Sequence, residues 1–209
     1  MKIYRMVLFI ILIILVGIGA SLTLKATVGV GAWNALAQSI SHLSHVKVGT
    51  IVMALNSFCV LGQWLLLRRR FGMRNLLQLP VGIVIGAVIN IIYYDVLGGF
   101  TVETYFYRLV LLIIAYNILA VSVAAVIVLD VISFPLEGFC MVLSEQKGWS
   151  FSSVRQFADV FSILIVLILT LSMSIESTIR EGTFIGMFLL GPLMGYYMRL
   201  IAPILRNKH

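Results

Sequence analysis

TVGVGAWN at residues 27–34 and VISFPLEG at residues 131–138 interrupt an otherwise almost continuous series of apolar runs. The two stretches occupy corresponding places in the two halves of the chain. A lipid bilayer cannot satisfy free backbone N–H and C=O groups, so non-helical backbone at membrane depth is tolerated only inside protein or beside a cavity. Paired interruptions of two halves are therefore the best pointer in a sequence to the binding site of a transporter.

The composition is that of an integral membrane protein. Of the 209 residues, 61% are hydrophobic and 11% are charged, and the mean hydropathy is +1.10, whereas soluble domains carry about 25% charged residues. The length accommodates roughly six spans of about 20 residues with short loops, so we expect a single membrane domain over residues 1–209. The apolar runs that predict these spans are Met6–Leu24, Val48–Leu67, Leu76–Leu97, Leu109–Leu129, Phe157–Ser174 and Gly182–Leu205.

The net charge of +7 is explained by membrane topology rather than by nucleic-acid binding. Six spans place both termini on one side, and with that side cytoplasmic, eleven of the fifteen Lys and Arg residues lie inside. Only Lys25, Lys47, Arg108 and Arg180 then lie outside, which agrees with the positive-inside rule. We expect a multi-pass protein of the cytoplasmic membrane with both termini inside, surrounded by lipid and without a nucleic-acid partner.

A weak internal repeat supports an all-α fold of six transmembrane helices. A shift of 103 residues aligns Asn34 with Glu137 and Asn56 with Asp159, and the half-repeats cover approximately residues 6–97 and 109–205. Each half has three spans, so the second half enters the membrane in the opposite sense, as in many secondary transporters with inverted repeats. After the first helix of each half, residues 27–46 and 131–148 form either re-entrant segments or short amphipathic helices on the two membrane surfaces.

Four charged residues are candidates for substrate binding, because ionisable groups in or beside membrane spans are costly and often functional. Glu137 lies within the second interruption. Arg155 and Asp159 are four residues apart, so they can form an ion pair on one helix face, with either a structural or a functional role. Lys25, just past the first span, either extends to the membrane interface or contacts an anion if the following segment is re-entrant.

Three uncharged residues complete the candidate binding site. Trp33 either stacks on a ligand or belongs to the aromatic belt at the interface, and Asn34 follows it directly. Asn56 lies within the second span. Amides at such positions usually bond between helices, adding about 0.6 kcal/mol, so helix packing is favoured over substrate contact for Asn56.

Signatures of catalysis are missing from the sequence. It contains no H-E-x-x-H, G-x-S-x-G or P-loop motif. His42 and His45 lack an obvious third ligand for a metal, and Cys59 and Cys140 stand in apolar surroundings typical of packing residues. We therefore expect no catalytic residue, no metal, no cofactor and no enzymatic activity.

Several blocks of the sequence resemble the YczE/YyaS/YitT family of bacterial integral membrane proteins. They are Gly17–Leu22, Lys25–Ala26, Val28–Leu36, Gly49–Thr50, Arg180–Thr183 and Gly191–Pro192. The family's first block carries Pro-Trp-Asp, whereas this chain has Ala32 and Asn34 in place of the Pro and the Asp. The resemblance implies a six-span protein of the bacterial inner membrane and no particular substrate.

Three functions are compatible with these features. The leading one is a small transporter or permease whose site for an unidentified small molecule or ion lies where the two broken segments converge, with Glu137 carrying a proton or cation. The second is a substrate-binding membrane subunit of a multi-component importer, which would have a coupling subunit as partner. The third is a non-transporting scaffold or regulator, and a homo-oligomer is compatible with each of them.

Overall fold

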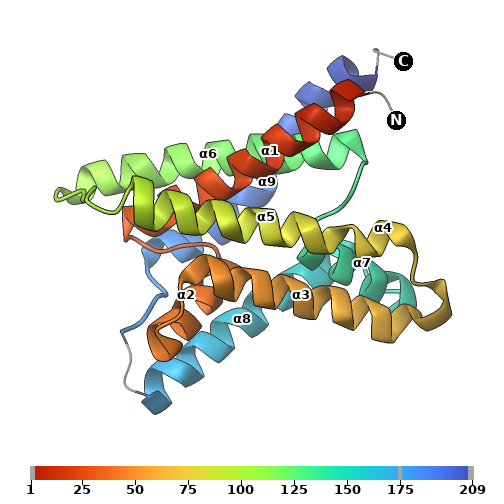
Figure 1. The fold of residues 1–209 in the computed structure, drawn as a ribbon. Coiled ribbons are helices and arrows are strands. Elements are labelled where there is room, and N and C mark those ends of the chain that lie inside the picture. The colour runs from red at the N-terminus through yellow and green to blue at the C-terminus, as the bar shows by residue number, and fades with distance from the viewer. Residues whose placement is uncertain (1–2, 174–175, 207–209) are drawn as a thin grey trace. The chain divides into compact units, whose positions relative to one another are not determined.

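A computed structural model describes residues 3–173 and 176–206, and every regular element in this part of the chain is a helix (Figure 1). Six of the helices are long and apolar enough to cross a membrane, which confirms the predicted fold class. Each is 23 to 25 residues long, and spanning the hydrocarbon core takes about 20. Their bounds are Ile3–Ala26, Val48–Arg70, Met73–Val96, Tyr105–Leu129, Phe151–Met173 and Glu181–Ile204.

The observed spans follow the predicted ones closely, and the fifth differs most. It begins at Phe151 rather than at Phe157, because its first two turns are polar and escape a search for apolar runs. Ser150 stabilises this earlier beginning, since its hydroxyl accepts a hydrogen bond from the Ser153 amide at 3.1 Å, as an N-cap does. Ser174, the predicted end of this span, lies outside the described residues.

The chain divides into two compact units, and each is described on its own. The first contains described residues within 1–31, 88–131 and 179–209, and the second contains those within 32–87 and 132–178. The units therefore do not coincide with the predicted half-repeats. Each unit combines helices from both halves of the chain.

The first unit is built around α6, which packs against both α1 and α9. Small residues allow close approach: Gly19 of α1 faces the Leu119 side chain, and Gly186 of α9 lies beneath the Tyr116 ring. The Tyr116 hydroxyl donates a hydrogen bond to the carbonyl of Gly182 at 2.8 Å. The helices of this unit are α1 (Ile3–Ala26), the π-helix η2 (Ile91–Val96), α6 (Tyr105–Leu129) and α9 (Glu181–Arg206).

The second unit pairs each short helix with a long helix from the other half of the chain. α2 packs against α8 as well as against α3, and α7 packs against α3 as well as against α8. Gly82 and Gly86 of α5 bring that helix close to Asn56 and Gly49 of α3. The helices of this unit are α2 (Ala32–Ser44), α3 (Val48–Leu67), η1 (Arg68–Arg70), α4 (Met73–Leu76), α5 (Gln78–Asn90, which continues into the first unit from Val88), α7 (Pro135–Lys147) and α8 (Phe151–Met173).

Both predicted interruptions are present, and each is followed by a helix of 13 residues. In the first, Thr27 and Gly29 have positive φ angles of 54° and 117°, which end α1 and turn the chain. In the second, Asp130 ends α6 in the left-handed conformation, and Pro135 occupies the first turn of α7, where proline's missing N–H costs nothing. In both interruptions, residues with positive φ end the preceding helix, and in the second a proline begins the next helix.

Candidate functional site

The first turns of the two short helices meet at one cavity within the second unit. Trp33 of α2 and Leu136 of α7 both line it, and its volume is about 430 Å³. The remaining walls come from the later turns of α7, as far as Leu143, from the central turns of α3, between Leu55 and Gly62, and from α8, between Val154 and Phe161. The cavity lies within the range of about 300–1,000 Å³ that is typical of small-molecule sites.

The walls of this cavity are apolar and rich in aromatic rings. Its inner wall includes a buried cluster of Cys59, Leu136, Cys140 and Val154, so the two cysteines are packing residues, as predicted. Trp33 packs against the same cluster. Five aromatic side chains line the cavity: Trp33, Phe58, Phe139, Phe157 and Phe161.

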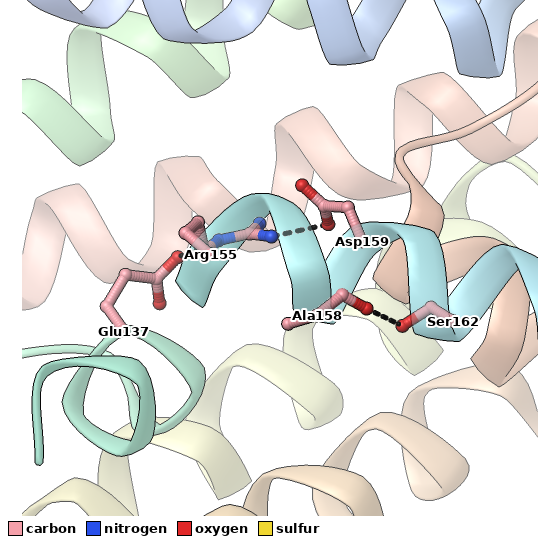
Figure 2. A network of polar contacts seen from close by, with 5 residues as sticks. All are labelled: Glu137, Arg155, Ala158, Asp159 and Ser162. Atoms are coloured by element: carbon pink, nitrogen blue, oxygen red, sulfur yellow. Dashed lines mark hydrogen bonds and ion pairs between the residues drawn. The ribbon is translucent and has the colours of Figure 1, made fainter. Parts of the chain in front are cut away.

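A triad of charged residues joins α7 to α8 (Figure 2). Arg155 forms the predicted ion pair with Asp159, one turn further along α8. On its other side, the Arg155 Nε lies 3.6 Å from the Glu137 carboxylate of α7. About a quarter of each of these three side chains is exposed. With both acids ionised, the triad has a formal charge of −1, because one guanidinium serves two carboxylates.

The triad borders the aromatic cavity. Each of its three members directly follows a cavity-lining residue along the chain. The excess charge of the triad therefore lies beside the cavity wall.

The structure gives each of the other candidate residues a definite environment. The Trp33 Nε1 is buried and has no hydrogen-bond acceptor within the described part of the chain. Asn34 lies in the first turn of α2 and is half-buried. Asn56 is buried, and its side chain lies close to Gly82 of α5.

Lys25 belongs to the first unit, where it has partners of its own. Its Nζ lies 3.4 Å from the carbonyl oxygen of Gly98 and 4.8 Å from the centre of the Tyr93 ring. Both contacts are at the end of the third span, which includes the π-helical turn η2. A cation over an aromatic face is attracted by the ring quadrupole.

An amide network that was not predicted anchors the beginning of α7. The Gln63 side chain of α3 donates to the Gln78 Oε1 at 2.7 Å and to the Pro135 carbonyl at 3.1 Å. It also accepts a bond from Asn75 at 2.9 Å, and Gln78 donates to Ser133 at 3.1 Å. The signal was present in the sequence, because both glutamines interrupt apolar runs.

The residues at the cavity can bind a ligand. Among residues 3–173 and 176–206, no group of three or more His, Cys, Asp or Glu side chains is placed to hold a metal ion. The triad can hold or release a proton or meet a cation, and the aromatic walls can enclose an apolar group.

Comparisons with known proteins identify a family. No curated protein and no solved structure matches the chain. A family model described as a family of unknown function, DUF6198, matches residues 3–199. Since this match covers nearly the whole sequence, the chain belongs to the DUF6198 family.

Proposed function

We propose that the protein is a small secondary transporter or permease that moves a small solute through the cavity of the second unit. One observation carries the proposal: the first turns of both short helices, one from each half of the chain, line the same cavity. A site built at the interface of two repeats from broken helices is typical of secondary transporters. The resemblance to YczE/YyaS/YitT proteins is compatible with this role.

Recurring contacts support an inverted repeat. The first broken segment is bonded to the beginning of the last span, since Gly182 N–H donates to the Val28 carbonyl at 2.7 Å. The second broken segment is bonded to the beginning of the third span, where Gln78 donates to Ser133. The two bonded pairs are related by the repeat, because a shift of about 103 residues takes Val28 to the neighbourhood of Ser133 and Gln78 to the neighbourhood of Gly182. The same shift relates the packing of α2 on α8 to the packing of α7 on α3, because it takes α2 to α7 and α3 to α8.

The re-entrant interpretation is favoured over surface helices. Pro135, the first residue of α7, packs against Gly82, which is close to the middle of the span Met73–Val96. At the other end of α7, Gln146 donates to the carbonyl of Leu66, in the last turn of α3. α7 therefore extends from the middle of the spans to one end of α3, as a re-entrant helix does.

Sided thiol labelling tests this interpretation. We would place single cysteines at Asn34→Cys and Glu137→Cys, in the first turns of α2 and α7, with Cys59 and Cys140 replaced by alanine. Leu43→Cys and Gln146→Cys, in the last turns, serve as matched controls. In sealed vesicles, an impermeant thiol reagent should reach the α2 sites from outside and the α7 sites from inside. The cysteines in the first turns should react more slowly than those in the last turns. Equal rates at all four sites would instead indicate surface helices.

In this proposal, the membrane is the bacterial cytoplasmic membrane, and both termini lie in the cytoplasm. The binding site comprises Trp33, Asn34, Glu137, Arg155 and Asp159. Glu137 carries the coupling proton or cation. It shares Arg155 with Asp159, so its own negative charge is not fully neutralised and is available to a proton or cation. Asn56 supports the site by packing, and Lys25 supports the first unit.

Glu137→Gln is expected to abolish transport and leave folding intact. The amide removes one negative charge while the Arg155–Asp159 pair remains. Proteoliposomes on a solid-supported membrane would be screened electrically against a panel of small solutes, comparing the wild type with this variant. Currents of the wild type should disappear in Glu137→Gln.

Glu145→Gln is the matched control, because Glu145 lies on the same helix, α7, and is exposed. It should leave the currents unchanged. Currents that persist in Glu137→Gln would exclude Glu137 from the mechanism. A wild type that gives no current with any solute would remove the transporter proposal, and recovery of transport only after adding a separate ATPase would favour the importer subunit.

A further inference from the structure

We propose that the cavity of the second unit selects apolar organic cations, that is, small molecules in which a positive charge is carried by an aromatic or aliphatic body. This inference rests on the proposed function for its site and adds the chemical class of the ligand. Two independent features carry it, the aromatic walls of the cavity and the excess negative charge beside it.

The walls suit an apolar, aromatic body. Trp33, Phe58, Phe139, Phe157 and Phe161 line a space of about 430 Å³, which is large enough for a molecule with several rings. The Phe157 and Phe161 rings are stacked, with centroids 6.4 Å apart and planes 15° from parallel.

The same rings favour a positive charge on the ligand. The face of an aromatic ring carries a negative partial charge, and tryptophan attracts cations most strongly. A ring face disfavours an anion for the same reason.

The formal charge of the triad also favours a cation. Arg155 is shared by Glu137 and Asp159, so one carboxylate charge is not neutralised within the triad. The residues directly before the three members, Leu136, Val154 and Ala158, line the cavity, so this charge lies next to the cavity wall. In a partly buried site, such a charge acts more strongly than it would in water. A cation in the cavity would be attracted, and an anion of equal shape would be repelled.

The mouth of the cavity indicates how such a ligand enters. Phe58, Phe157 and Phe161 each leave more than half of their surface exposed, so the cavity opens between α3 and α8. Both helices have the length and hydropathy of membrane spans. A ligand with an apolar body can therefore enter from an apolar environment.

Tetraphenylphosphonium and tetraphenylborate provide a direct test, because they have nearly the same shape and opposite charge. Replacing the exposed Trp64 and Trp149 by phenylalanine leaves Trp33 as the only tryptophan of the chain. In detergent, tetraphenylphosphonium should change the Trp33 fluorescence saturably. Tetraphenylborate should bind at least about tenfold more weakly. Equal binding of the two probes would overturn the proposal and indicate a site for neutral chains such as lipid tails.

Variants in the same background separate charge from shape. Glu137→Gln should weaken tetraphenylphosphonium binding about tenfold, and Glu145→Gln should leave it unchanged. Asp159→Asn also removes one negative charge from the triad. It would be used in place of Glu137→Gln if Glu137→Gln does not purify as a folded species. Ala158→Leu should block both probes by filling the cavity. Unchanged affinity in Glu137→Gln or Asp159→Asn would overturn the proposal.

The two experiments distinguish a failure of the proposed ligand class from a failure of the proposed transport function. Selective tetraphenylphosphonium binding without currents from any solute would keep the ligand class and remove the transporter proposal. Currents that depend on Glu137, together with no saturable tetraphenylphosphonium binding, would keep transport and overturn the ligand class.

Discussion

Gly29→Ala is expected to lower the stability of the protein strongly. Gly29 has a φ of 117°, a conformation that residues with a Cβ rarely adopt, and a Cβ built there would lie 2.7 Å from the backbone nitrogen of Thr183. Backbone strain and overpacking each cost about 1–3 kcal/mol. Thr183 is fully buried, so neither side can move aside easily. The measurement is the thermal unfolding temperature in detergent.

Two other glycines separate the causes of this loss. Gly31 has open space around a built Cβ and no positive φ, so Gly31→Ala should leave the unfolding temperature unchanged. Gly148 has a φ of 67° and equally open space, so Gly148→Ala should cost the strain alone. A Gly29→Ala variant no less stable than Gly148→Ala would contradict the close contact with Thr183.

Gln63→Met is expected to have the second large effect. Gln63 is fully buried, and its removal would leave the Gln78 Oε1 and the Pro135 carbonyl without their donor. A buried polar group without a partner costs about 1–3 kcal/mol. Because Pro135 begins α7, the beginning of that helix should loosen. Hydrogen exchange of the amides near Pro135 should increase, and the unfolding temperature should fall.

Gln146→Met is the matched control for this substitution. Gln146 also donates to a backbone carbonyl, that of Leu66, but its side chain is exposed and water can replace the bond. Its replacement should therefore change stability little. If both variants unfold at the wild-type temperature, the amide network does not anchor α7.

The sequence predicted the features that depend on composition and on local spacing. Six spans follow from apolar runs, and the places of the two breaks follow from the segments that contain Gly29 and Pro135. The pair of Arg155 and Asp159 follows from a four-residue spacing on one helix. Each of these depends on neighbours in the sequence, which a single chain displays directly.

Features that depend on packing between distant segments could not be read in this way. Glu137 reaches Arg155 across α7 and α8, and nothing in their spacing indicates the contact. Gln63 and Gln78 were visible as polar residues in apolar runs, but their common partners near Pro135 depend on how α3, α5 and α7 pack. The same holds for Lys25, whose neighbour Tyr93 lies 68 residues further along the chain.

The reciprocal pairing of α2 with α8 also has a consequence for biosynthesis. α2 ends at Ser44, and α8 begins at Phe151, 107 residues later. At a translation rate of about 5–20 residues per second, the synthesis of α2 is complete roughly 5–20 seconds before the first residue of α8 is made. During that interval, the first short helix has to wait at the insertion machinery or the membrane surface, so its final docking is expected to be among the last steps of assembly.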